Sequence, residues 1–148
     1  MTDERDRAEA EIVGLHEFFE GWIAGDLAND DETYEDRFLE HMSPYFTMVQ
    51  PGGALTEYDG LTRGMRGAHG SNPEFRIAIT DVVVRIRLGD TLVVTYTEWQ
   101  RNAKASKPAN NGRRATVVFD DLGDRMIWCH VHESWLPPEQ MAAGDYGF

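Results

Sequence analysis

The sequence predicts an α+β domain, in which about three helices pack on one face of a curved antiparallel sheet of about six strands. Three observations support this prediction. The first forty residues space their apolar side chains as helices do, the rest of the chain is rich in β-branched segments of alternating polarity, and turn residues separate those segments. Helices followed by a run of strands are typical of the α+β class. Because 148 residues suit a single domain, we expect one unit over residues 1–148.

Three helices are expected, two of them near the N-terminus. The first covers residues 4–24, and Gly25 is placed to end it, because glycine accepts a left-handed conformation. A second helix is expected over residues 31–42, behind an acidic first turn that suits the helix dipole. A short third helix over residues 60–70 is weakened by its glycines. The apolar stripe of the first helix consists of Ile12, Leu15, Phe19 and Trp22.

Strands are expected through most of the chain after residue 44. The expected strands are residues 45–50, 54–58, 75–88, 91–101 and 113–121, and a last strand within 125–138 that ends at its prolines. The first two form a hairpin around Pro51, and the last four form a meander whose long loop covers residues 102–112. Polarity stops alternating near residues 80–84, which predicts a bend or bulge there.

Two carboxylates stand in apolar rows of the expected sheet. Alternation gives the last strand one face with Ile127, Cys129, Val131, Glu133 and Trp135. In the strand over residues 91–101, the more apolar face holds Leu92, Val94, Tyr96, Glu98 and Gln100. These strands run in the same direction with one strand between them. Glu98 and Glu133 are therefore expected about 10 Å apart, at ~4.8 Å per strand, near one end of the sheet.

Glu98 and Glu133 are the candidate catalytic residues. If the two carboxylates are enclosed, desolvation raises their pKa values and makes either one a candidate base or a receptor for a cation. The alternative is that each strand end emerges into water and both carboxylates are solvated. Aromatic residues at these spacings can form the walls of such a pocket, or they can simply belong to the core.

The opposite face of the last strand holds Trp128, His130, His132 and Ser134. This amphipathic row is suited to a subunit interface, so we expect a homodimer that packs through it. Two histidines two positions apart can also bind a metal ion, but such a site needs a third ligand, and nothing in the sequence places His41 or His69 nearby. We therefore expect no metal site. Cys129 lies within a strand among apolar neighbours, where a thiol is usually inert.

Composition excludes several classes of partner. The net charge of −12 argues against nucleic acid, which needs clustered lysine and arginine, and against an anionic membrane surface. No apolar run approaches the ~20 residues of a membrane span, and the charged N-terminus lacks the apolar core of a signal peptide. A single cysteine excludes an internal disulfide and agrees with a reducing compartment. We expect a cytoplasmic protein.

Several segments resemble the nuclear-transport-factor-2-like superfamily, and within it the SnoaL-like branch related to the association domain of calcium/calmodulin-dependent kinase. The segments are "WIAGDL", "YFTMVQPGG", "TEWQ" and "IWCHVHESWLP", and the resemblance extends over about residues 9–138. It implies a conical half-barrel with an internal pocket and a homodimer packed through the outer sheet. We expect no cofactor. In the association-domain relatives, charged pocket residues occupy the strand rows of Glu98 and Glu133, which supports their inward orientation.

Ketosteroid isomerase, an enzymatic relative, provides a comparison of essential groups. The resemblance aligns its general-base aspartate with Gln50 and its oxyanion tyrosine with Phe18, so both groups are missing and that chemistry is not expected. The resemblance and the alternation together give a pocket lined by Phe18, Trp22, Tyr34, Gln50, His69, Tyr96, Trp135, Glu98 and Glu133. We expect this pocket to bind a small hydrophobic metabolite, or to act on it as a cofactor-free cyclase, isomerase or dehydratase. The alternative function is a non-catalytic association module.

Overall fold

A computed structural model describes residues 3–148 and confirms the α+β class. The helices are α1 (Glu4–Ala24), α2 (Asp31–Arg37), the 3-10 turn η1 (Leu39–His41), α3 (Tyr58–Gly67) and α4 (Pro138–Ala142). The strands are β1 (Met42–Val49), β2 (Leu55–Glu57), β3 (Arg76–Leu88), β4 (Thr91–Arg101), β5 (Asn111–Asp121) and β6 (Met126–Trp135). The expected second helix is shorter than predicted, because Phe38 leaves the helical conformation after Arg37 and η1 follows. The short helix α4 was not expected.

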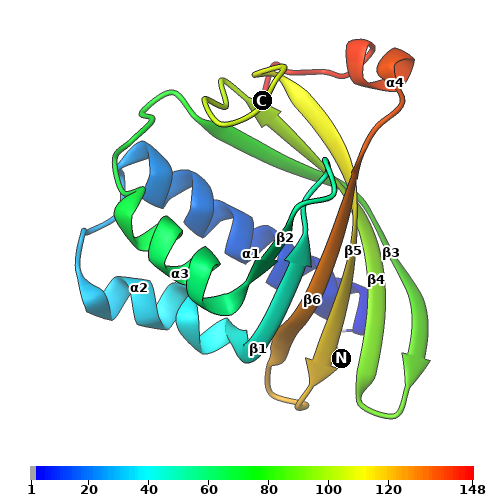
Figure 1. Ribbon diagram of the computed structural model, residues 1–148. Helices are drawn as coiled ribbons and strands as arrows, with labels where there is room; N and C mark the ends of the chain where they lie inside the picture. Colours follow the sequence, from blue (N-terminus) through cyan, green and yellow to red (C-terminus); the bar gives the residue numbers. More distant parts are fainter. Residues whose placement is uncertain (1–2) are drawn as a thin grey trace.

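The six strands form one open sheet in the order β2-β1-β6-β5-β4-β3. Strands β3 to β6 make the predicted meander, and β1 and β2 make the predicted hairpin. The expectation of a purely antiparallel sheet is wrong, because β1 pairs with β6 in parallel. No hairpin turn joins these two strands, so no turn fixes their relative direction. Figure 1 shows α1, α2 and α3 together on one side of the bent sheet.

Helix α1 supplies much of the layer that faces the sheet. Asp3 caps its first turn through the amide of Asp6, and Gly25 ends it in the left-handed region with φ of 86°. Ile12, Phe18 and Trp22 along the helix are completely buried. Each such side chain contributes about 1.5–3 kcal/mol relative to an exposed position. The helix is therefore fixed in the core over most of its length, and Phe18 and Trp22 pack against Tyr34 of α2.

A bulge in β6 changes which side chains face the helices. Val118 pairs with His130 and the next residue, Phe119, pairs with Trp128, so Cys129 is an extra residue opposite β5. An extra residue shifts the alternation by one position, so the residues after the bulge face the opposite side from the one that unbroken alternation would give them. Strand β3 has irregularities of the same kind between Thr80 and Val83, which confirms the bulge predicted there.

Among residues 3–148, none of the helices combines the length and the apolar character that crossing a lipid bilayer requires.

Two glycines, Gly14 within α1 and Gly25 at its end, provide a matched test of the left-handed cap that ends this helix. A Cβ added at Gly25 would lie 3.0 Å from the Cα of Gly70, in a left-handed backbone, whereas one added at Gly14 meets nothing within 4 Å. We predict that Gly25→Ala lowers the free energy of unfolding by about 1–2 kcal/mol or more. Gly14→Ala should raise it by about 0.5–1 kcal/mol, because alanine loses less conformational entropy within a helix. Urea unfolding of both variants measures the difference, and equal effects would contradict the assigned cap.

Candidate functional site

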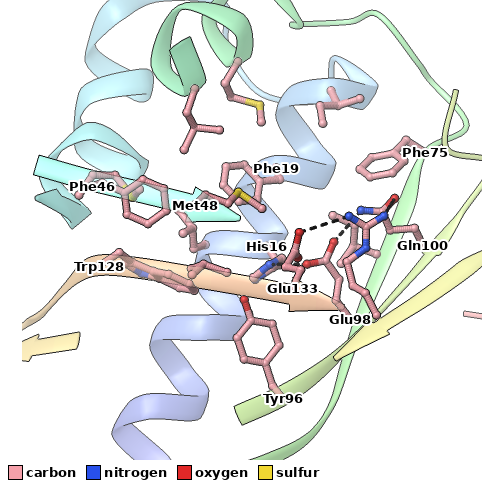
Figure 2. Close-up of a pocket in the computed structure, with 18 residues that line it drawn as sticks. His16, Phe19, Phe46, Met48, Phe75, Tyr96, Glu98, Gln100, Trp128 and Glu133 are labelled. Atoms are coloured by element: carbon pink, nitrogen blue, oxygen red, sulfur yellow. Dashed lines mark hydrogen bonds and ion pairs between the residues drawn. The ribbon is translucent and has the colours of Figure 1, made fainter. Parts of the chain in front are cut away.

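A cavity of about 170 Å³ lies between α1, α3 and the concave face of the sheet. Its walls are mostly apolar, and include Leu15, Phe19, Phe46, Met48, Trp128 and Val131. One end of it is polar and is formed by His16, Tyr96, Glu98, Gln100, Arg113 and Glu133. Figure 2 shows Glu98, Gln100 and Glu133 toward one side of the cavity, with Phe46, Met48 and Trp128 toward the other.

Strand register brings the polar residues together. Glu98 on β4 pairs directly with Arg113 on β5, and Tyr96 pairs with Ala115, which in turn pairs with Glu133 on β6. Arg113 and Glu133 are therefore diagonal neighbours on the inner face, a position from which long side chains can interact. Ala115, between Tyr96 and Glu133, has only a methyl group and so leaves space between them. Two carboxylates and one guanidinium thus share a small, largely apolar enclosure.

His16 of α1 neutralises Glu98. Its Nε2 lies 3.0 Å from Oε1 of Glu98, and its Nδ1 lies 2.7 Å from the carbonyl oxygen of Ile12. A carbonyl and a carboxylate can only accept, so both ring nitrogens donate and the imidazole is cationic. Burial by itself lowers the pKa of His16, but the charge and hydrogen bond of Glu98 outweigh it, and the pKa is raised. Burial likewise favours a higher pKa for Glu98, yet His16, Arg113 and the Gln100 amide lower it to about 2.

Gln100 connects Glu98 to Arg113. Its Nε2 donates to Oε2 of Glu98 at 2.6 Å, and its Oε1 accepts from Nη2 of Arg113 at 3.2 Å. The same Nη2 also donates to Asn111 at 2.9 Å and to Ser106 at 3.3 Å, and the guanidinium lies 4.8 Å from the centre of the Trp135 ring. Neutral acceptors therefore fix one side of the guanidinium in place.

Glu133 is the less compensated of the two carboxylates. It is 3% exposed, and its one contact with a cation is the 3.4 Å approach of its Oε1 to Nη1 of Arg113. Among residues 3–148, no other side chain forms a hydrogen bond with it. Burial, followed by the charge of Glu98, raises the pKa of Glu133 to about 8, against the weaker opposing effects of Arg113 and His16. At neutral pH it is mainly a neutral acid that can donate a hydrogen bond.

Tyr96 adds a second neutral donor beside this cavity. The side chain is almost completely buried, and no hydrogen-bond partner of its hydroxyl is found within residues 3–148. Burial, together with the charges of Glu98 and Glu133, raises its pKa well above the usual value. The hydroxyl therefore stays protonated and is free to donate to a molecule in the cavity.

The structure brings three of the candidate pocket residues together, namely Tyr96, Glu98 and Glu133. Phe18, Trp22 and Tyr34 do not line the cavity; they pack against one another in the core, with ring centres 5.0–6.1 Å apart. His69 contacts Trp22 outside the cavity. Gln50 is exposed and donates to Thr56, and Trp135 is 37% exposed at the rim of a separate surface depression.

Three of the four residues expected on the outer face lie there. His130 accepts or donates a hydrogen bond with Thr47 at 2.8 Å, and His132 and Ser134 are exposed. The prediction for Trp128 is wrong, because the extra residue Cys129 turns this side chain inward. Its indole donates to Glu11 of α1 at 2.9 Å. Ile127 and Cys129, predicted to face inward, lie outside the cavity for the same reason.

His16, Gln100 and Arg113 were not singled out as site residues from the sequence, although the sequence contained a signal for each. Gln100 ends the same apolar row as Glu98, and Arg113 begins the row that continues through Ala115 and Val117. His16 lies one helical turn after Ile12, in the apolar stripe of α1. A polar residue in an apolar row was the signal that identified the two glutamates, and it applies equally to these three.

No metal site is visible in the part of the chain that the structure describes. Within residues 3–148, no three histidine, cysteine, aspartate or glutamate side chains lie close enough together to hold an ion. His16 has both ring nitrogens engaged, and Glu98 is bound by His16 and Gln100. What the cavity offers is hydrogen-bond donors and one guanidinium.

Comparison with known proteins identifies a domain family. Residues 8–137 match the family described as sucrose-6-phosphate phosphohydrolase C-terminal. Sucrose-phosphatase 1 of Nicotiana tabacum is 27% identical over 134 residues, which cover 85% of this chain and 30% of the tobacco protein. The chain therefore spans less than a third of the length of the curated relatives that it matches.

Solved structures confirm the expected nuclear-transport-factor-2-like fold. An NTF-2-like protein of unknown function from Pseudomonas aeruginosa has a TM-score of 0.75 at 24% identity, covering 88% of this chain and 99% of that one. The CaMKII hub of S. rosetta has a TM-score of 0.61 at 18% identity, covering 85% of this chain and 94% of the hub. At these identities the likeness concerns the fold.

The ion pair between His16 and Glu98 predicts a contribution to the free energy of unfolding that depends on pH and is largest at intermediate pH. Because the pKa of His16 is raised, its ion pair adds stability in full below pH 6.5, the ordinary pKa of histidine. That stability is lost as the pH rises through the raised pKa. The lowered pKa of Glu98 adds stability above its ordinary value of 4.5, and this is lost as the pH falls. Glu98→Gln should therefore cost about 3–5 kcal/mol, most strongly between pH 4.5 and 6.5.

Urea unfolding at a series of pH values measures this difference. Glu17→Gln is the matched control, because Glu17 is exposed on the same helix as His16 and should change stability little at any pH. A difference between wild type and Glu98→Gln that does not vary with pH would contradict the ion pair.

Proposed function

Since the chain belongs to the sucrose-6-phosphate phosphohydrolase C-terminal family, we propose that it forms a small-molecule-binding module. The observation that carries the proposal is Glu133, a buried acid with a weak cationic partner at the edge of a largely apolar cavity. Such an acid is costly to keep unless it interacts with something in the cavity. The ligand is a compact molecule with an apolar body and one polar group that reaches Glu133, Tyr96 or Arg113.

The two glutamates have different parts in this proposal. Glu98 is bound by His16 and Gln100, so its role is to hold the charged end of the cavity in place. Glu133 keeps an accessible proton near neutral pH, so it is the group that contacts the ligand and the one suited to general-acid chemistry. A cofactor-free acid–base reaction on the bound molecule would depend on Glu133.

A sugar phosphate, the substrate that the name of the family suggests, suits this cavity poorly. The mostly apolar walls offer few partners to the hydroxyl groups of a sugar, and the volume of about 170 Å³ suits a molecule of about the size of benzene. Arg113 is the one cation at the polar end besides the paired His16. The ligand of this module therefore differs from the substrate of the longer relatives.

Filling the cavity should abolish binding. Met48 is half-buried on β1 and lines the cavity, so a larger side chain can enter the space. With phenol as the probe ligand, we predict that Met48→Trp raises the dissociation constant at least tenfold. Val83→Trp, at an exposed position of β3, should leave it unchanged. Calorimetric titration measures both, and unchanged binding of phenol by Met48→Trp would exclude this cavity as the binding site.

We also propose that the outer face of the sheet forms a homodimer. A half-exposed row of Val93, Val118, His130 and Thr47 crosses four strands in register, on the face opposite α1, α2 and α3. Half-exposed apolar and histidine side chains of this kind are typical of subunit interfaces. The likeness in fold to a CaMKII hub supports an association role for this domain. Ligand binding and association would then use opposite faces of one sheet.

A charge in this row should prevent association. We predict that Val118→Glu converts the dimer to a monomer at micromolar concentration, because each glutamate would be buried without a partner at the interface. Ala105→Glu adds the same charge in the exposed loop before β5 and should leave the dimer intact. Light scattering coupled to gel filtration measures both masses. A wild-type protein that is monomeric at that concentration would contradict this proposal.

A further inference from the structure

We infer that the molecule bound in the cavity is a small monoanion, a carboxylate whose charged group lies between Arg113 and Glu133. This inference rests on the proposed binding function and adds the chemical class of the ligand. The apolar body of the ligand would lie along Phe19, Met48 and Trp128.

The charges of the polar end balance only through the long contact between Arg113 and Glu133, whose nearest atoms are 3.4 Å apart. His16 and Glu98 neutralise each other in a direct hydrogen-bonded pair. The remaining cation is Arg113, whose close acceptors Gln100, Asn111 and Ser106 are all neutral. Charge-assisted hydrogen bonds between nitrogen and a carboxylate are usually about 2.7–2.9 Å long, so the 3.4 Å contact with Glu133 leaves Arg113 able to take a closer anionic partner.

Arg113 has hydrogen-bonding capacity left for that charge. The residue is 7% exposed, and its Nε has no hydrogen-bond partner among the residues that the structure describes. Its Nη1 has only the 3.4 Å contact with Glu133. Buried donors are rarely left unsatisfied in proteins, and a carboxylate is the acceptor that best suits a guanidinium.

Glu133 completes the site if it carries a proton. The neutral acid donates an O–H···O⁻ hydrogen bond to one oxygen of the ligand, whereas an ionised Glu133 would repel it. The ionisable groups around Glu133 are Glu98 and Tyr96 of β4, Arg113 of β5 and His16 of α1. With the pKa of Glu133 near 8, the donating form predominates at neutral pH.

The size of the cavity limits the rest of the molecule. Its volume of about 170 Å³ is close to that of an apolar cavity of about 150 Å³ that binds benzene in another protein. A single ring or a short branched chain beside the carboxylate would fill it. Benzoate and benzamide are therefore suitable probes, because they share one shape and differ in charge.

The experiment is calorimetric titration of the full chain with each probe at pH 6.5. We expect benzoate to bind at least tenfold more tightly than benzamide. Arg113→Met should remove this preference, because it replaces the guanidinium by an apolar side chain of similar length. Glu133→Gln should preserve it, because the amide still donates a hydrogen bond to the ligand.

The pH dependence provides a second measurement that needs no variant at Arg113. Above pH 8 the wild-type protein must take up a proton to bind benzoate, so its affinity should fall about tenfold per pH unit. In Glu133→Gln the affinity should not change over the same range, because the amide does not titrate. Benzamide binding by the wild type should show no such decrease.

The possible failures are distinguishable. If phenol and benzamide bind at least as tightly as benzoate, and Met48→Trp abolishes their binding, the monoanion inference is wrong and the cavity remains a binding site. If neither benzoate nor phenol binds at millimolar concentration, the inference and the proposed function are both wrong. An equal decrease of benzoate affinity with pH in wild type and Glu133→Gln would also overturn the role of Glu133.

Discussion

The extra residue Cys129 in β6 determines what each face of the sheet carries. On its C-terminal side Val131 and Glu133 face the helices, and on its N-terminal side Trp128 does the same although it lies three positions from Val131. A regular strand would turn either the indole or the carboxylate outward, because side chains alternate strictly. The bulge therefore places an apolar wall and an acidic end in one cavity, and leaves His130 and His132 on the other face.

Five ionisable groups line a largely apolar cavity, and this gives the two carboxylates different protonation states. Glu98 has a close cation and two hydrogen bonds, so its pKa falls to about 2, whereas Glu133 has one long contact and its pKa rises to about 8. Two neighbouring carboxyl groups with separated pKa values take different roles, one fixed and charged, the other able to donate a proton. Gln100 links the two halves, since it contacts both Glu98 and Arg113.

The elements determined by local residue patterns could be predicted from the sequence. Gly25 ends α1 as expected, the irregularity of β3 lies where the alternation stops, and Glu98 and Glu133 themselves face inward. The bulge of β6 could not be found in this way, because Ile127 and Cys129 are apolar enough to suit an inner row.

Other features depend on contacts between distant parts of the chain. The parallel pairing of β1 with β6 and the pairing of His16 with Glu98 join residues far apart in the sequence, so no local pattern contains them. Helical spacing predicts that Trp22 is buried, and the resemblance places Phe18 in the pocket, but a core and a cavity wall require the same spacing. The neighbours from α2 and α3 fill the space around these two rings, and this decides in favour of the core.

The two proposed roles of the domain meet in β6. His130 faces outward and the next residue, Val131, faces the cavity, so a partner subunit on the outer face would pack directly behind the cavity wall. Glu133 lies two residues further along the same strand, between the outward-facing His132 and Ser134. A second subunit packed on the outer face of β6 would hold the bulge at Cys129 more rigidly than solvent does. It would thereby also fix the position of Glu133. Association would then help to preorganise the binding site without contributing any residue to it.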